Sequence, residues 1–191
     1  MSNVRPHQVP VFELHMRSSA DGGFTSAWFD DEACLWNDER LAMPRALVSE
    51  WVAPRLRLYR SEEKPTAVLF NPNAIAVSQK LKDELASFPE LEFLEVLVQD
   101  HGSFFILHVI TALELPPKSS ARVASAPSGN LVELHSLPES FVSPSGFFRI
   151  WHPNGSAARR AGLAAKPIYA GSEGKAAVQR VASQFLEARQ K

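Results

Sequence analysis

Residues 21–39 hold residue types suited to the recognition of another molecule. They include six acidic residues and no basic residue. Aromatic side chains that can anchor an interface lie among carboxylates that can steer a basic surface into place. The candidate partner-binding residues are Phe24, Trp28, Phe29, Asp30, Asp31, Glu32, Trp36, Asp38 and Glu39. The stretch predicts a contact surface for a positively charged partner; in the open alternative, its aromatic residues fill the core while its acidic residues face water.

Patterns that could support nucleophilic catalysis or phosphate binding are weak. Ser143-Pro144-Ser145-Gly146 lacks the Gly-x-Ser-x-Gly frame and the strand–turn–helix context of a nucleophile elbow. Cys34 is the only cysteine, and its acidic neighbours disfavour the reactive thiolate. No glycine-rich phosphate-binding motif is present. We therefore expect no catalytic residue and no cofactor.

The histidines are scattered singly, without the paired spacing of metal ligands, so we expect no metal site. They are His7, His15, His101, His108, His135 and His152. His108 lies within an apolar run, which predicts a buried, neutral imidazole with one nitrogen hydrogen-bonded. The alternative is a small enzyme whose site is assembled from dispersed residues, such as His108 and a carboxylate.

Basic and apolar residues alternate from Arg55 to Arg60. This period of two predicts a strand with Leu56 and Leu58 facing inward and Arg55 and Arg57 facing outward. An outward arginine row either binds phosphate or acidic groups or is simply solvated.

The elements that position these residues are clearest from residue 75 to residue 115. Ser78 is expected to cap a helix with its side chain, and Pro89 is expected to end that helix near Phe88. The residues that predict its buried face are Leu81, Leu85 and Phe88. Residues 91–98 and 104–110 are apolar runs separated by turn residues 100–103, which predicts a β-hairpin with the helix packed on one face.

Further elements are expected on either side of this stretch. Residues 24–40 predict a structured loop with one helical turn, and residues 147–151 predict a strand. Residues 156–161 predict a short basic helix, and residues 168–169 predict a last strand. A final helix is expected to be capped by Ser172. The apolar stripe of that helix is formed by Val178, Val181, Ala182, Phe185 and Leu186.

The stretch from residue 75 to residue 115 resembles a family of bacterial immunity proteins. The matching segments are residues 77–85, 91–96 and 104–115, with a later echo at residues 147–150 and 158–163, so that about half of the chain is covered. The chain departs from the family at His108, where the family more often has Asn, and residues before Val52 have no counterpart. Family members are found beside polymorphic toxins, often those of contact-dependent or type VI secretion systems.

The resemblance implies a protein that binds a cognate toxin and blocks its active site or its activation. No residue of the family carries an assigned role that transfers to this chain. Toxins that act on nucleic acids usually have basic clefts, which the acidic and aromatic residues of 21–39 would suit. Besides the enzyme alternative, a structural or adaptor subunit with a permanent partner remains open.

Length and composition predict one α+β domain over residues 1–191. We expect a mainly antiparallel sheet with two or three helices packed on one face, and a mobile connector at residues 116–129. A net charge of −1 gives no global field for nucleic acid. The single cysteine, the absence of an apolar signal segment at the N-terminus and the lack of a membrane-spanning run predict a cytoplasmic protein without membrane contact.

Overall fold

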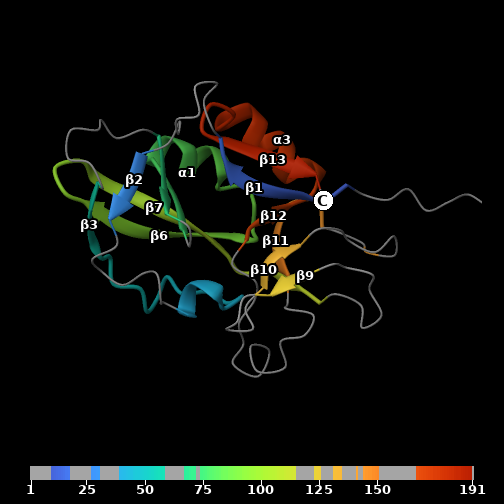
Figure 1. The fold of residues 1–191 in the computed structure, drawn as a ribbon. Helices are drawn as coiled ribbons and strands as arrows, with labels where there is room; N and C mark the ends of the chain where they lie inside the picture. Colours follow the sequence, from blue (N-terminus) through green and yellow to red (C-terminus); the bar gives the residue numbers. More distant parts are fainter. Residues whose placement is uncertain are drawn as a thin grey trace, which may run out of the picture.

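The computed structural model describes residues 10–17, 27–30, 39–58, 67–71, 74–114, 123–125, 131–134, 141, 144–150 and 167–190. These residues form a closed six-stranded barrel, a five-stranded sheet, a separate two-stranded sheet and two α-helices (Figure 1). Most strand pairs are antiparallel, and the parallel pairs among the described strands are β2–β4, β3–β6 and β8–β11. The predicted α+β class with a sheet-dominated core is confirmed.

The barrel has the strand order β2-β3-β6-β7-β5-β4 and is closed by the pairing of β2 with β4. Its strands are β2 (Ala27–Asp30), β3 (Arg55–Leu58), β4 (Val68–Asn71), β5 (Ala74–Val77), β6 (Leu91–Val98) and β7 (Gly102–Val109). Alternate residues of these strands, including Leu56, Leu94, Val96 and Ile106, form one apolar cluster. The period-two pattern of the sequence therefore gives the barrel its buried interior.

The predicted hairpin is formed by β6 and β7. Its register runs from Leu91 opposite Val109 to Val98 opposite Gly102, so the second strand begins two residues before the predicted start. Asp100 and Gly102 have φ values of 62° and 82° in the turn. Such left-handed conformations favour Gly and Asp, which explains why turn residues occur here.

The five-stranded sheet has the order β13-β1-β12-β11-β8. Its strands are β1 (Phe12–Met16), β8 (Ala112–Leu113), β11 (Phe147–Ile150), β12 (Tyr169–Ala170) and β13 (Leu186–Gln190). The separate sheet pairs β9 (Val123–Ser125) with β10 (Leu131–Leu134). The strand prediction at residues 168–169 was right, but β12 is not the last strand.

The predicted extension of the final helix to Leu186 was wrong. Helix α3 spans Ser172–Val181, and Leu186 begins β13, which pairs with β1 from Met16 back to Phe12. Apolar residues at helical spacing continue past Val181, but pairing with a strand at the other end of the chain takes precedence over the local pattern. The helix N-cap is Gly171 rather than the expected Ser172.

The two α-helices share an apolar cluster with the barrel and the sheet. Helix α1 (Gln79–Leu85) contacts β5 and β7, whereas α3 contacts β12 and β13, and the helices also contact each other. Leu81, Leu85 and Val178 are buried in this cluster. Ser78 occupies the N-cap position of α1 as predicted, but its side chain makes no capping hydrogen bond, and the helix ends three residues before Phe88.

Several expectations outside the hairpin need correction or lie beyond the described residues. Residues 27–30, predicted as loop, form strand β2, and the 3₁₀ helix η2 (Glu39–Ala42) begins at the end of the stretch in which one helical turn was predicted. The predicted connector at 116–129 contains β9. The predicted helix at 156–161 lies outside the described residues. Within the described part of the chain, no helix has the length and apolar character needed to cross a membrane.

Candidate interaction surface

The segment from Arg45 to Val52 links η2 to β3 and closes one end of the barrel. Leu47 is completely buried and belongs, with Leu41 of η2, to the apolar cluster of the barrel interior. Burial of a leucine side chain stabilises a fold by about 1.5–3 kcal/mol. Leu47 therefore fixes the middle of this segment against the barrel.

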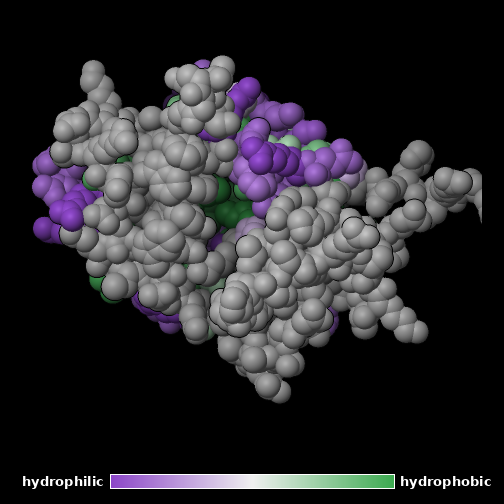
Figure 2. Space-filling view, viewed as in Figure 1, coloured by the Kyte–Doolittle hydropathy of each residue, from purple (hydrophilic) through white to green (hydrophobic). Residues whose placement is uncertain are grey.

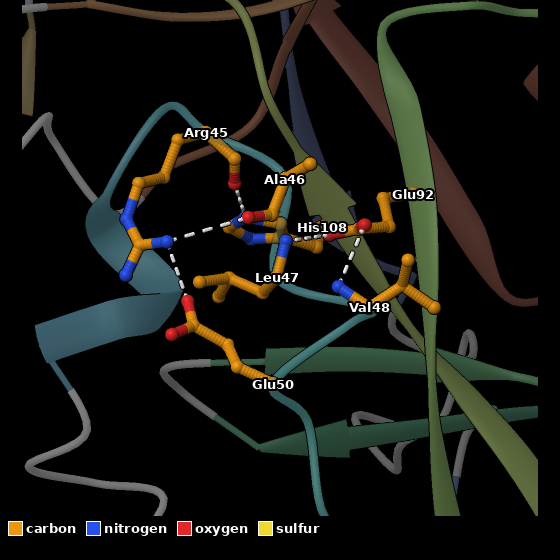
Figure 3. Close-up of polar contacts among 7 residues, drawn as sticks. All are labelled: Arg45, Ala46, Leu47, Val48, Glu50, Glu92 and His108. Carbon is orange, nitrogen blue, oxygen red and sulfur yellow. Dashed lines mark hydrogen bonds and ion pairs between the residues drawn. The ribbon is translucent and has the colours of Figure 1, made fainter.

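Glu92 of β6 fixes the backbone at Leu47 and Val48 (Figure 3). Its carboxylate accepts hydrogen bonds from the backbone N–H of Leu47 at 2.7 Å and of Val48 at 2.8 Å. Hydrogen bonds to a charged acceptor are about twice as strong as neutral ones. A single side chain thus satisfies two consecutive amides of an irregular segment.

His108 of β7 holds the start of the segment. The imidazole is fully buried, and its Nε2 lies 3.0 Å from the carbonyl oxygen of Arg45. A carbonyl can only accept, so Nε2 carries the hydrogen and donates it. Burial lowers the pKa of His108, and the nearby charge of Arg149 adds to this, while the Arg45 carbonyl and Glu92 oppose it. The prediction of a buried His108 with one hydrogen-bonded nitrogen is confirmed, and the lowered pKa favours the neutral imidazole.

Further contacts fix the end of the segment. The indole Nε1 of Trp51 donates to the carbonyl oxygen of Glu95 at 2.7 Å, and the guanidinium of Arg40 lies 5.4 Å from the centre of the Trp51 ring. Arg45 and Glu50 form an exposed ion pair across the segment at 2.5 Å. Anchors at both ends and in the middle leave the segment little conformational freedom.

Two valines project from this anchored segment into solvent. Val48 is 63% exposed and Val52 is 84% exposed, and they are the exposed large apolar residues of the described chain. Single exposed apolar residues are common on protein surfaces. Here both occur on one short segment whose backbone is fixed by buried contacts. Such a segment loses little entropy when a partner covers it, which is the physical property of a preorganised binding surface.

The segment leads into β3, whose outer face borders a cleft. Arg55 and Arg57 are exposed while Leu56 and Leu58 are buried, which confirms the predicted orientation of this strand. The cleft has a volume of about 370 Å³ and lies between β3 and the end of β6. Its lining residues are Arg55, Leu56, Arg57, Leu97, Val98, Gln99 and Asp100. Figure 2 shows the nearby β6–β7 turn as a hydrophilic tip at the left of the view.

The predicted acidic and aromatic residues are only partly within the described chain. Phe24, Asp31, Glu32, Trp36 and Asp38 lie outside it. The structure places the backbone of the other four in two elements that precede the 45–52 segment in the sequence: Trp28, Phe29 and Asp30 in β2, and Glu39 at the start of η2. Phe29 pairs with Leu58 and Asp30 pairs with Arg57 in the β2–β3 ladder. Strand β2, which carries Asp30, therefore lies directly beside β3, which carries Arg55 and Arg57.

Val48, Val52 and Glu92 were not identified from the sequence. The signal for the valines was an apolar run between Pro44 and Pro54, too short and irregular for a buried element. Glu92 had no signal, since it looked like an ordinary polar residue of an alternating strand.

Ser145 has a structural contact rather than a catalytic one. Its hydroxyl donates to the carboxylate of Glu173 at 3.0 Å, and its carbonyl oxygen accepts the amides of Glu173 and Gly174, both at 3.0 Å. Ser145 therefore satisfies amides in the first turn of α3. No group of three or more potential metal ligands occurs among the described residues.

Comparison with known proteins gives no assignment. No protein-family model matches the chain, and no curated protein matches it significantly.

Proposed function

We propose that this chain is an immunity protein that neutralises a bacterial toxin by binding it. The main support is that Val48 and Val52 are exposed on the 45–52 segment, whose backbone is fixed by Glu92, His108 and the barrel core. A protein inhibitor needs a rigid contact surface more than it needs a cleft with reactive groups. The resemblance of residues 75–115 to immunity proteins supports the choice of a toxin as the partner.

The proposed interface combines the 45–52 segment with the acidic and aromatic residues predicted from the sequence at residues 21–39. Asp30 in β2 is paired in backbone register with Arg57 in β3, so strands that carry residues of both charges are adjacent. Interspersed charges fix the register of a complex and reject wrong partners. We place the protein in the cytoplasm, with inhibition by covering the toxin's active site or preventing its activation.

The enzyme alternative has less support from this geometry. His108 is fully buried, and the carboxylate nearest to it along the β6–β7 ladder, Glu92, accepts two backbone amides. An imidazole without solvent access cannot meet a substrate in this conformation. The adaptor alternative expects a large, flat apolar surface, whereas the exposed large apolar residues of the described chain are Val48 and Val52.

The test is rescue of cells from a toxic partner. The tagged chain is used to isolate partners from its native host, the co-purifying protein is identified by mass spectrometry, and that protein is expressed with and without the chain. We expect rescue by the unaltered chain and loss of rescue with Val48→Asp combined with Val52→Asp. The matched control is Gln179→Asp, which places a carboxylate on the exposed face of α3.

A second pair of variants tests the predicted acidic and aromatic residues. Asp30→Lys and Trp36→Ala are expected to weaken rescue while the thermal unfolding midpoint stays unchanged. Rescue that survives these two changes but fails with the valine variants would limit the interface to the 45–52 segment. If no captured protein is toxic, or if the chain rescues cells from none, the immunity function is wrong.

A further inference from the structure

We infer that the cleft between β3 and β6 binds a carboxylate side chain of the partner protein, with Arg55 as its main contact. This inference rests on the proposed function for the nature of the partner as a protein. The selectivity of the cleft for a carboxylate follows from its own residues.

The position of the cleft is set by the parallel pairing of β3 with β6. Arg55 is level with Leu97, and Leu56 is level with Val98. The backbone amides of Leu97 and Gln99 donate to the carbonyl oxygens of Pro54 and Leu56 at 2.9 and 2.8 Å, so the two strands form the floor. At one end of the cleft the outward side chains are therefore the guanidinium of Arg55 and the half-buried side chain of Leu97.

The charges around the cleft single out Arg55. No hydrogen bond or ion pair of the Arg55 side chain is found in the described part of the chain, whereas Arg57 does make a further contact and is paired in backbone register with Asp30. Asp100 also lines the cleft, three residues beyond Leu97 and so at the end away from Arg55. A second carboxylate is consequently attracted to Arg55 and repelled from the Asp100 end.

Glu95 of β6 is a further acidic residue among those that the structure describes, and its carboxylate is bonded on the side away from β3. It accepts a hydrogen bond at 2.6 Å from the hydroxyl of Ser103, which lies on β7. Strand β7 pairs with β6 on the side opposite β3. Glu95 therefore does not occupy the guanidinium of Arg55.

The same end of the cleft has an apolar border. The hydrogen bond from Trp51 to the carbonyl of Glu95 and the one from Leu97 to Pro54 place residues 51–54 alongside β6. Val52, which is 84% exposed, lies within this stretch. A ligand that fits has a carboxylate for the planar guanidinium fork and an aliphatic or aromatic neighbour for Val52 and Leu97. An Asp or Glu beside an apolar residue in the partner's surface has this chemistry.

Peptide selection tests the inference without knowledge of the toxin. A random-peptide library displayed on phage is selected against the full chain, and enriched peptides are synthesised and measured by fluorescence anisotropy. We expect enrichment of peptides with Asp or Glu next to apolar residues. Arg55→Gln should weaken binding of these peptides about tenfold to a hundredfold, because a charge-assisted hydrogen bond is lost. Changing the peptide's acidic residue to its amide should have the same effect and should add nothing further in the Arg55→Gln protein.

The control is Arg180→Gln on the exposed face of α3, which should leave peptide binding unchanged. Enrichment of no peptide, enrichment without acidic residues, or full affinity in Arg55→Gln would overturn the inference. The outcomes separate it from the proposed function. Acid-selective binding without rescue in cells keeps the cleft and rejects the immunity function, whereas rescue that is unaffected by Arg55→Gln keeps the function and rejects the cleft.

Discussion

The carboxylate of Glu92 lies 2.7 Å from the backbone nitrogen of Leu47, a residue 45 positions earlier in the chain. The same carboxylate accepts the amide of Val48, the first of the two exposed valines. A strand residue of the barrel thereby fixes both the buried and the exposed part of the proposed binding segment. Fold stability and presentation of the surface are coupled through this one side chain.

Glu92→Ala should destabilise the protein and loosen the 45–52 segment. Loss of hydrogen bonds to a charged acceptor is expected to cost about 1.5–3 kcal/mol in the free energy of unfolding, measured by urea denaturation. Glu92→Gln should cost less, because its amide oxygen can still accept one bond. Hydrogen exchange at the amides of Leu47 and Val48 should be faster in both variants.

Glu84→Ala is the matched control, since Glu84 is exposed on α1 and should change stability by less than about 0.5 kcal/mol. Unchanged exchange at Leu47 and Val48 in Glu92→Ala would show that Leu47 alone holds the segment.

His108 predicts a specific pH dependence of stability. Because burial lowers its pKa in the folded state below the ordinary value of about 6.5, the unfolded chain takes up a proton that the folded chain refuses. The neutral side chain therefore contributes fully above about pH 6.5, and this contribution is lost as the pH falls from there toward the lowered folded value. Urea unfolding between about pH 7.5 and about pH 5 measures the loss.

The contribution of His108 is isolated by comparison with His108→Gln, which keeps a donor for the Arg45 carbonyl but does not titrate. The stability difference between the two proteins should shrink or reverse as the pH falls. The matched control is His101→Gln, which makes the same substitution on the exposed β6–β7 turn. A difference that stays constant over this range would show that His108 titrates normally in the fold.

The sequence was informative where local patterns and the final pairing agree. In the β6–β7 hairpin, alternating apolar residues and the turn around Gly102 specify the same structure, and the prediction succeeded. At Leu186 the helical spacing indicated one element and pairing with Met16 produced another. The residues around Leu186 carry no sequence pattern that predicts pairing with β1, which lies at the other end of the chain.

The candidate surface shows the same limit. The outward orientation of Arg55 follows from alternation within four residues, and it was predicted. The exposure of Val48 depends on a contact between its backbone and Glu92, 44 residues away. Contacts of this range leave no periodic signal, so the anchoring of the segment is visible only in the folded structure.

Gly171 should tolerate no side chain. A Cβ at this position would lie 1.9 Å from the carbonyl oxygen of Pro144, which is a backbone atom. The next residue, Ser145, accepts the amides of Glu173 and Gly174 in α3 through its own carbonyl oxygen. Gly171→Ala must displace that backbone and is expected to cost about 1–3 kcal/mol or more in thermal or urea unfolding. Gly171→Asn should be worse, because its side chain is larger.

Gly102 provides the contrast, because its requirement is conformational rather than steric. Its φ is +82°, and a Cβ there would have no atom within 4 Å. Gly102→Ala should cost about 1–2 kcal/mol through the left-handed backbone, and Gly102→Asn should recover part of this loss because Asn tolerates that region. At residue 102 the Ala variant should therefore be less stable than the Asn variant, whereas at residue 171 the Asn variant should be less stable than the Ala variant. The same order of stability at both positions would contradict this account.

Leu47 and Val48 are neighbours with opposite exposure, so truncating each should affect a different property. Leu47→Ala removes a fully buried side chain at the barrel end and should lower the free energy of unfolding by about 2–5 kcal/mol. Val48→Ala removes a side chain that is 63% exposed and should change stability by less than about 0.5 kcal/mol. In the toxin-rescue assay at a temperature where both proteins remain folded, Val48→Ala should be the variant that weakens protection. If Val48→Ala protects fully while remaining as stable as the unaltered chain, the exposed face of the 45–52 segment does not contact the partner, even if the chain is an immunity protein.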